Sequence, residues 1–262
     1  MRANAASTSY ARASVSARAR ASRGDRDDAC GRVRARPRAV AAAATKSERP
    51  PSDARALAVF VSGGGSNMRA IHAACESGAV RGRIACVVTN AADCGGAAWA
   101  RERGVAVLEY PPKKNASGGL SADDLVTALR DAHGVDFVLL AGYLRLIPPE
   151  LCRAYENKMV NIHPALLPAF GGKGMHGENV HKAVVASGAR FTGPTIHFVN
   201  EEFDKGKIIA QAVVPVRDDD DYRAVAARVL EQEHILFPRV VAALCDDRVR
   251  FRDDGVPYII DA

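Results

Sequence analysis

Asn161 and His163 stand two residues apart in the run N-I-H-P, where an apolar stretch ends at Pro164. Side chains two residues apart on a strand point to the same face, so the amide and the imidazole should lie side by side. An amide can donate a hydrogen bond to a developing oxyanion, and an imidazole can exchange the proton of an attacking amine. The pair therefore indicates an acyl-type transfer. The alternative is a histidine with a purely structural role.

A glycine-rich run, S-G-G-G-S-N at residues 62–67, is called the glycine turn below. Glycines let a ligand approach the backbone, and the N–H groups of a following helix point at an anion. A dinucleotide fingerprint or a hydrolase nucleophile elbow would need glycine where Met68 stands, and no Lys-Ser/Thr pair follows as in a P-loop. The turn predicts a phosphate site, with a mere tight connection as the alternative.

A third element is the turn F-D-K-G at residues 203–206, between two β-rich runs. The Asp204 carboxylate could lie beside the imidazole of His163 and raise its pKa. Taken alone, an aspartate at such a place is usually a turn former. His197, on a neighbouring expected strand, could compete for the catalytic role, but a structural role is favoured for it.

The elements that must position these groups follow from hydrophobic periodicity. Strands are predicted at residues 57–61, 84–88, 105–108, 137–140 and 159–163. Helices are predicted to follow at residues 68–75, 97–103 and 125–132. The last of them is opened by Ser121 and Asp124 at capping-box spacing. This alternation predicts an α/β fold with an open, mostly parallel twisted sheet and helices on both faces.

The pattern changes after Pro164. Two β-rich runs at residues 195–199 and 207–216 predict antiparallel strands added in the C-terminal half. A final helix is predicted over residues 222–241. Its expected apolar face consists of Val225, Val229, Ile235 and Leu236.

Residues 1–52 consist largely of Ala, Arg and Ser, with 11 Arg and 1 Lys against 3 Asp and 1 Glu, a net charge of +8. This composition is typical of an organellar transit peptide, and its Ala and Ser content favours a chloroplast over a mitochondrion. A basic tail that binds nucleic acid is the alternative. Residues 53–262 are predicted to form a single catalytic domain.

The remaining composition excludes several classes of protein. Residues 53–262 hold 24 basic and 26 acidic residues, a net charge of −2 that completes the total of +6, so no excess positive charge grips a nucleic acid. The six cysteines form no CxxC pair or zinc-finger spacing, which predicts reduced thiols and no metal. No apolar run approaches 18 residues, so no membrane span is expected.

The three elements occur together in the order found in the glycinamide ribonucleotide formyltransferase family, which the chain resembles over residues 57–251. The resemblance rests on six runs: S-G-G-G-S-N at 62–67, L-A-G-Y-L-R-L-I at 140–147, N-I-H-P-A-L-L-P at 161–168, T-G-P-T-I-H-F-V at 192–199, F-D-K-G at 203–206 and Q-E-H-I-L-F-P at 232–238. It implies the formyltransferase fold and 10-formyltetrahydrofolate as co-substrate. It also implies 5'-phosphoribosylglycinamide as acceptor, in purine (IMP) biosynthesis.

The resemblance also implies roles for single residues. Asn161, His163 and Asp204 match the catalytic trio. The binding residues would be Gly65, Ser66, Asn67 and Glu233 for the ribonucleotide, and Leu144, Arg145, Leu146, Ile147 and Asn161 for the folate, the latter largely through main-chain contacts. The loop at residues 200–204 would close the folate pocket. One departure is the loop 113–119, which offers only Lys113 and Lys114 where bacterial relatives carry an arginine. A second is the glycine-rich run 171–177, which fits a lid, with a plain surface loop as the alternative.

The resulting hypothesis is direct formyl transfer, with Asn161 and a protonated His163 stabilising the oxyanion and Asp204 keeping the imidazole charged. A formyltetrahydrofolate hydrolase is one rival, although residues 1–52 are too short and polar for the extra regulatory domain of those relatives. A methionyl-tRNA formyltransferase should have a basic folded part. A non-catalytic nucleotide-binding module would keep the glycine turn and need neither Asn161 nor His163. The sequence does not indicate an oligomeric state.

Overall fold

The structure is a computed structural model and describes residues 53–112 and 120–260. Its first half comprises β1 (Arg55–Val61), α1 (Ser66–Glu76), β2 (Gly82–Thr89), α2 (Gly95–Glu102), β3 (Ala106–Glu109), α3 (Ala122–Thr127) with the π-helical turn η1 (Ala128–Ala132), and β4 (Phe137–Leu140). The second half comprises α4 (Pro149–Ala154), β5 (Met159–His163), α5 (Glu178–Ser187), β6 (Phe191–Thr192), β7 (Thr195–Phe198), β8 (Ile208–Gln211), β9 (Val214–Pro215), α6 (Tyr222–Cys245), β10 (Val249–Phe251) and β11 (Pro257–Ile259).

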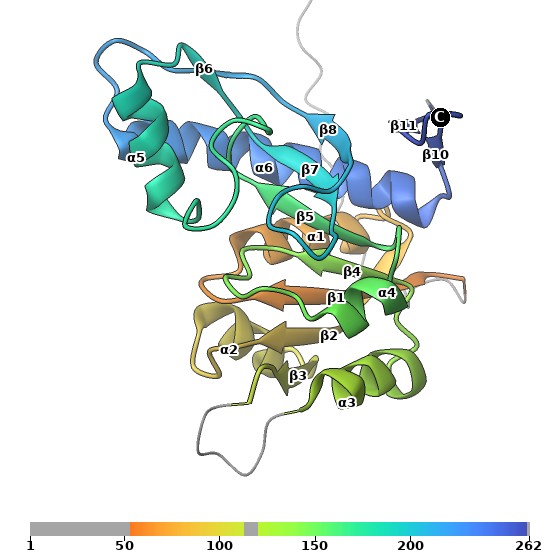
Figure 1. The fold of residues 1–262 in the computed structure, drawn as a ribbon. Helices are drawn as coiled ribbons and strands as arrows, with labels where there is room; N and C mark the ends of the chain where they lie inside the picture. Colours follow the sequence, from red (N-terminus) through yellow and green to blue (C-terminus); the bar gives the residue numbers. More distant parts are fainter. Residues whose placement is uncertain (1–52, 113–119, 261–262) are drawn as a thin grey trace, which may run out of the picture. The chain divides into compact units, whose positions relative to one another are not determined.

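Seven strands form one sheet in the order β3-β2-β1-β4-β5-β7-β8 (Figure 1). The strands from β3 to β5 pair in parallel, whereas β7 is antiparallel to both β5 and β8. The predicted α/β class, with antiparallel strands added in the C-terminal half, is thereby confirmed. The sheet changes direction at β5, the strand that carries Asn161 and His163.

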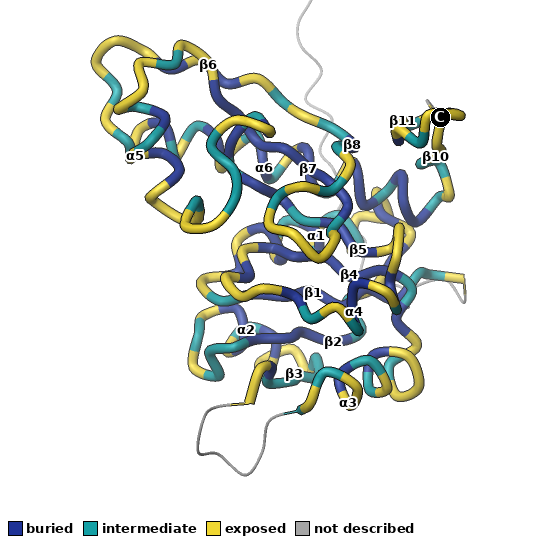
Figure 2. The backbone as a smooth tube through the Cα atoms, viewed as in Figure 1, coloured by how far each residue is buried: buried dark blue, intermediate teal, exposed yellow. Residues whose placement is uncertain are grey.

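Helices cover both faces of the sheet, as predicted. Side chains of α1, α2 and α6 pack against Leu57, Val59 and Val61 on one face, whereas α3, η1 and α4 pack against Ala58 and Phe60 on the other. Six of the seven β1 residues are therefore buried, as Figure 2 shows for the central strands. A parallel strand covered on both faces needs such a continuous apolar run.

The capping box predicted for α3 is present: the Ser121 hydroxyl accepts the Asp124 N–H at 3.1 Å, and the Asp124 carboxylate accepts the Ser121 N–H at 3.3 Å. In residues 53–112 and 120–260, no helix is long and apolar enough to span a bilayer. The predicted leader, residues 1–52, and the loop with Lys113 and Lys114 lie outside the described residues.

Two details of the C-terminal half differ from the sequence prediction. The run at 207–216 is not one strand, because the chain leaves the main sheet after β8 and then pairs β9 with the separate strand β6. Gly193 permits this crossing, since a Cβ there would lie 1.8 Å from the Ala212 carbonyl oxygen. Ile235 is 61% exposed, because it lies about 200° around α6 from the buried Glu233 and Phe237.

Candidate active site

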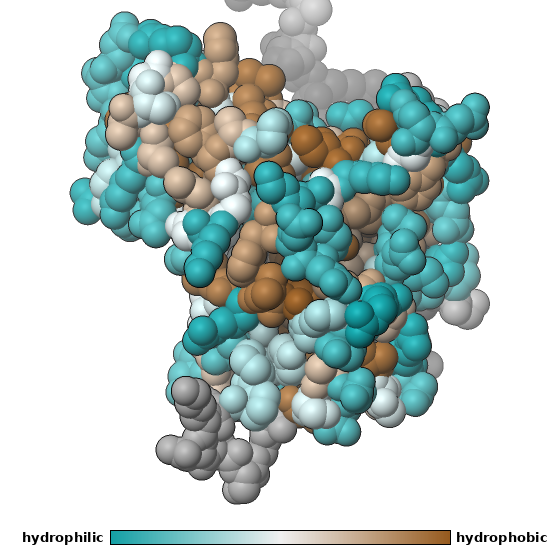
Figure 3. All heavy atoms as spheres, viewed as in Figure 1, coloured by the Kyte–Doolittle hydropathy of each residue, from teal (hydrophilic) through white to brown (hydrophobic). Residues whose placement is uncertain are grey.

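A cavity of about 790 Å³ lies where the parallel strands β1, β4 and β5 end. Ligands of open α/β sheets bind at this edge, outside the carboxyl ends of the strands. Asn161 and His163 line the cavity from β5, and Asp204 lines it from the loop after β7. In Figure 3, apolar atoms gather in the middle of the face that carries the loops following β4 and β7.

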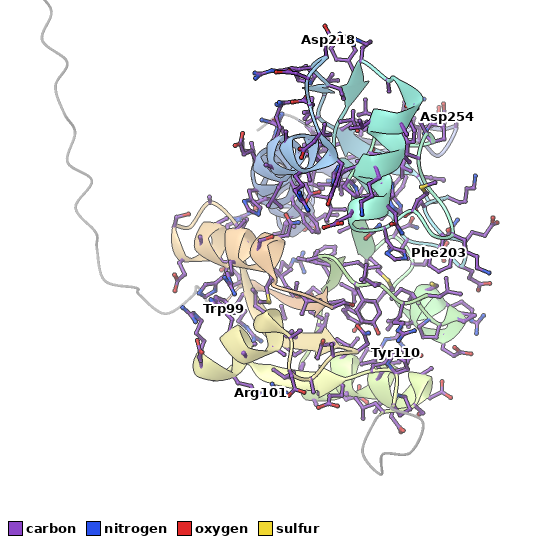
Figure 4. The ribbon with its side chains drawn as sticks, turned by 90° about the vertical axis from the view of Figure 1, so that its left-hand side faces the viewer. Trp99, Arg101, Tyr110, Phe203, Asp218 and Asp254 are labelled. Carbon is purple, nitrogen blue, oxygen red and sulfur yellow. The ribbon has the colours of Figure 1, made fainter. Side chains whose placement is uncertain are left out.

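The three residues predicted to be catalytic come together in this cavity. His163 Nδ1 lies 3.5 Å from Asp204 Oδ2, and Asn161 Nδ2 lies 3.5 Å from Asp204 Oδ1. Phe203, labelled in Figure 4, precedes Asp204 on the loop and is 41% exposed, whereas the Asp204 side chain is 11% exposed. The carboxylate therefore turns inward toward the amide and the imidazole.

His163 is buried, and each of its ring nitrogens has a neighbour. Nε2 donates a hydrogen bond to the Phe170 carbonyl at 2.8 Å, which leaves Nδ1 for Asp204 and a substrate. Burial lowers the pKa of His163, and the Asp204 carboxylate and the Phe170 carbonyl raise it without restoring the ordinary value. Asp204 thus raises the pKa of His163, as expected, but the net shift is downward because desolvation outweighs the neighbouring charge.

Asp204 is held by backbone as well as by side chains. Burial raises its pKa, but the neighbouring His197 and His163 rings and the Gly172 N–H together hold the pKa below its ordinary value. The Gly172 N–H donates to Asp204 Oδ2 at 2.8 Å. The preceding Gly171 has no room for a side chain, because a Cβ would lie 2.4 Å from Leu167 and 3.3 Å from the Asp204 Cβ.

Thr195 on β7 fixes the loop that delivers these backbone groups. Its hydroxyl donates to the Ala165 carbonyl at 2.6 Å and accepts the Leu167 N–H at 3.0 Å, and both bonds are buried. Gln211 donates to the same hydroxyl at 2.9 Å. The carbonyl that binds His163 and the N–H that binds Asp204 both follow in this loop, so Thr195 secures the alignment of the pair.

At the other end of the cavity, the glycine turn begins α1; Ser62, Gly63 and Asn67 line the cavity, whereas Gly65 and Ser66 lie outside its lining. Gly65 is the N-cap in a left-handed conformation with φ of 73°, and no side chain caps the helix. A Cβ on Gly65 would lie 3.0 Å from the Gly96 Cα, so the turn packs closely on the start of α2. The first N–H groups of α1 are therefore available to an anion.

Asn67 and Glu233 lie next to this helix start and form a buried pair. Asn67 Nδ2 donates to Glu233 Oε2 at 2.6 Å, and burial raises the pKa of Glu233 while this hydrogen bond lowers it. Asn67 Oδ1 is buried and has no hydrogen-bond partner among the described residues. Both residues line the cavity, which places the Asn67–Glu233 pair beside a bound ligand.

Residues 142–147 form the wall of the cavity after β4, where the folate is expected. Tyr143 and Ile147 are buried and anchor the segment, and the Tyr143 hydroxyl donates to the Tyr110 carbonyl at 2.7 Å. Leu144 and Leu146 are 51% and 52% exposed, and Arg145 is exposed as well. Apolar side chains and main chain thus line this wall together.

Comparison with known proteins identifies the family. The formyl transferase family matches residues 55–241 of the chain. The chain belongs to this formyl transferase family. A relative named phosphoribosylglycinamide formyltransferase, chloroplastic, from Arabidopsis thaliana is 58% identical over 204 residues, which cover 78% of this chain and 70% of that protein.

Two solved structures share the fold of this formyl transferase. Glycinamide ribonucleotide transformylase 1 from Symbiobacterium toebii is 34% identical with a TM-score of 0.70, over 83% of this chain and all of that one. A formyltetrahydrofolate deformylase from Pseudomonas syringae is 26% identical with a TM-score of 0.68, over 79% of this chain and 66% of that one. The fold alone therefore does not separate transferase from hydrolase.

The sequence did not predict the contacts that His197 makes in this formyl transferase. It pairs with Asn161 across β5 and β7, and its Nε2 lies 3.1 Å from Asn161 Nδ2 and 3.6 Å from Asp204 Oδ1. Its Nδ1 donates to the Phe198 carbonyl at 2.7 Å, so its Nε2 is the ring nitrogen that accepts the Asn161 amide. The signal that could have revealed this contact is the register of the two β runs, which places residues 161 and 197 opposite each other.

The glycine-rich run 171–177 also lines the cavity of this formyl transferase, beginning at Gly172 beside Asp204. His181 follows on α5, also lines the cavity and is buried, and its Nδ1 has no hydrogen-bond partner within the part of the chain that the structure describes. The sequence did not single out this histidine, since it offers no donor two residues away. Its placement depends on how α5 packs on α6, which no local pattern predicts.

Proposed function

We propose that this chain transfers the formyl group of 10-formyltetrahydrofolate to the amine of 5'-phosphoribosylglycinamide in de novo purine biosynthesis, giving formylglycinamide ribonucleotide and tetrahydrofolate. One observation carries the proposal: the Asn161, His163 and Asp204 side chains share a cavity with an uncapped helix start. The first group suits acyl transfer to an amine, and the second suits the phosphate of the acceptor.

In the proposed reaction, the substrate amine attacks the formyl carbon and a C–N bond forms. The carbonyl electron pair moves to oxygen, and the Asn161 amide donates a hydrogen bond to this oxyanion. A donor of this kind typically lowers the barrier by about 3–4 kcal/mol. The C–N10 bond to the folate then breaks, and N10 leaves with a proton.

His163 and Asp204 carry that proton. Because burial lowers the pKa of His163, its Nδ1 is free to accept the proton of the attacking amine. The imidazolium that forms lies 3.5 Å from the Asp204 carboxylate, which stabilises the charge until the proton passes to N10. This account replaces the expectation of an imidazole that is already charged before the substrates bind.

The binding sites are assigned to the two ends of the cavity. The ribonucleotide phosphate would lie on the N–H groups of the glycine turn, at Gly65, Ser66 and Asn67, with Glu233 on the ribose hydroxyls. The folate would lie along residues 144–147, next to Asn161 and the loop at 200–204. None of the proposed catalytic and binding roles requires a metal ion, and the absence of a metal stays a prediction.

Hydrolysis of formyltetrahydrofolate is the second candidate, because a deformylase shares the fold. The glycine turn and the Asn67–Glu233 pair favour transfer, since a hydrolase has no acceptor nucleotide to hold. The test measures tetrahydrofolate release from 10-formyltetrahydrofolate with and without 5'-phosphoribosylglycinamide. Release that depends on the ribonucleotide is expected, and equal release without it would establish the hydrolase.

The proposed compartment is the plastid. Support comes from the basic, Ala- and Ser-rich residues 1–52 and from the relative of Arabidopsis thaliana that is named chloroplastic. A mitochondrial destination is the alternative. We further propose that the partners are these two small molecules and that no nucleic acid binds.

A further inference from the structure

We propose that Ser62 is a positioning residue that holds the folate-binding segment in place, an inference that rests on the proposed function. Ser62 follows β1 and begins the glycine turn, whereas the segment 142–147 follows β4. The arrowheads of β1, β2 and β4 point to the same side in Figure 1. The first residues after these three strands therefore meet at one edge of the sheet.

Three hydrogen bonds join Ser62 to the neighbouring strand ends. Its N–H donates to the Gly142 carbonyl at 3.0 Å, and its hydroxyl accepts the Leu144 N–H at 2.9 Å. The hydroxyl also donates to Asn90 Oδ1, just after β2, at 2.5 Å. A serine hydroxyl has one proton, which it donates in the hydrogen bond to Asn90 Oδ1, so an oxygen lone pair is left to accept the Leu144 N–H.

The hydroxyl takes over where the backbone ladder between β1 and β4 ends. Gly142 has φ of 84°, a left-handed conformation that turns the chain away from the sheet. The Leu144 N–H thus receives a side-chain acceptor beyond the last strand pair. Because a trans peptide is planar, fixing this N–H also fixes the direction of the Tyr143 carbonyl.

The other anchors of the segment 142–147 hold side chains, whereas Ser62 holds the peptide between Tyr143 and Leu144. The Tyr143 hydroxyl donates to the Tyr110 carbonyl, and the Tyr143 ring packs edge-on against the Phe60 ring with their centroids 5.2 Å apart. Ile147 is buried. Leu144 and Leu146 are exposed between these anchors. A wall that recognises a folate through its main chain needs its peptide planes fixed before binding. Ser62 supplies this at residue 144.

The test compares Ser62→Ala with Ser77→Ala, which removes an exposed hydroxyl at the far end of α1. Direct binding of tetrahydrofolate and the KM of both substrates are measured. We expect Ser62→Ala to weaken tetrahydrofolate binding and raise the KM for 10-formyltetrahydrofolate by about five- to tenfold, the size of one hydrogen bond. The KM for the ribonucleotide and the melting temperature should stay near those of Ser77→Ala.

Asn90 supplies a second pair of variants. Asn90→Asp keeps an acceptor for the Ser62 proton and should bind tetrahydrofolate like the wild type, whereas Asn90→Leu should share the defect of Ser62→Ala. Unchanged folate binding in Ser62→Ala, or equal losses for both substrates, would overturn the inference. A wild-type chain that binds tetrahydrofolate without transferring formyl overturns only the proposed function, and one that does not bind it overturns both.

Discussion

Asn67 Nδ2 donates a hydrogen bond of 2.6 Å to Glu233 Oε2, which joins the first turn of α1 to the middle of α6. Glu233 is 8% exposed, and burial raises the pKa of its carboxyl group above the ordinary value. A buried carboxyl group without a cationic partner destabilises the fold in its charged form. Its presence here is explained by the ligand proposed for the cavity.

Glu233→Gln separates the role of Glu233 in ligand binding from the destabilising effect of its buried charge. The variant should raise the KM for the ribonucleotide about tenfold or more and leave the KM for the folate unchanged. Because the folded pKa of Glu233 is raised, its neutral form favours folding at low pH, and that stability is lost as pH rises through the folded pKa. Glu233→Gln should therefore melt higher than the wild type at neutral pH, with a difference that disappears below the ordinary carboxyl pKa. Thermal melts from pH 4 to 8 would check this, and a lower melting temperature at pH 7 would contradict it.

Glycine-turn substitutions test the phosphate site. Gly65→Val is expected to raise the KM for the ribonucleotide far more than that for the folate. Gly65 has a left-handed conformation, however, and a side chain there would also press on Gly96, so this variant strains the fold as well. Gly63→Val is the cleaner variant, since Gly63 lines the cavity and a Cβ there meets nothing within 4 Å. It should raise the ribonucleotide KM without lowering the melting temperature. Equal changes in the KM values of both substrates would contradict a phosphate site at this turn.

Asp204→Asn should lower kcat by about 10² or more with little change in folate binding, because the shape of the side chain is kept and its charge is lost. The pKa of His163 should fall further, since Asp204 is the charge that raises it. The acid limb of the pH profile of kcat should then move to lower pH. A limb that stays in place would show that His163 is not the titrating base.

The double variant tests whether Asp204 and His163 act as a unit. His163→Ala should be similarly damaging, and the combination should be no worse than the more damaging single change. Losses that multiply would mean independent action, and the proton relay would then fail even with formyl transfer established.

Thr195→Val removes the hydroxyl that holds the loop after β5 while keeping the shape of the side chain. It leaves the buried Leu167 N–H without an acceptor, which typically costs about 1–3 kcal/mol. We expect a lower melting temperature and a lower kcat, since the Phe170 carbonyl and the Gly172 N–H lose their support. Thr195→Ser keeps the hydroxyl and is the matched control. A wild-type kcat in Thr195→Val would show that the loop is fixed elsewhere.

A chain that begins at residue 52 should fold and work normally, because the leader prediction assigns residues 1–52 no role in the mature enzyme. A chain that begins at residue 57 is the matched control, as it removes Arg55 and its ion pairs with Asp136 and Asp247. Only this shorter chain should melt at a lower temperature. Aggregation or inactivity of the longer one would refute the leader prediction.

Local patterns predicted what depends on neighbours along the chain. Ser121 and Asp124 form their capping box because its partners are three residues apart. Asn161 and His163 both line the cavity because a strand alternates its faces. The turn at residues 203–206 allowed Asp204 to lie beside His163, but the resemblance to a family was needed to favour this over an ordinary turn former, since nothing in these residues specifies the strand that they approach.

What the sequence did not predict depends on contacts across the fold. The place of His197 beside Asn161 follows from the register of β5 and β7, and the break in the run 207–216 follows from the approach of Gly193 to Ala212. The pKa of His163 is lowered because the folded protein buries the ring, and no motif specifies that burial.

The strand β5 is hydrogen-bonded along both edges, to β4 in parallel and to β7 in antiparallel fashion. Asp204, by contrast, takes a left-handed conformation with φ of 54° in a loop that follows the strands. Amide hydrogens of β5 should therefore exchange with solvent only on global unfolding, and those of residues 200–206 through smaller local openings. On gentle heating, the loop that carries Asp204 should open first, which moves its carboxylate away from Asn161 and His163. Turnover should therefore be lost while β5 still holds the amide and the imidazole in place.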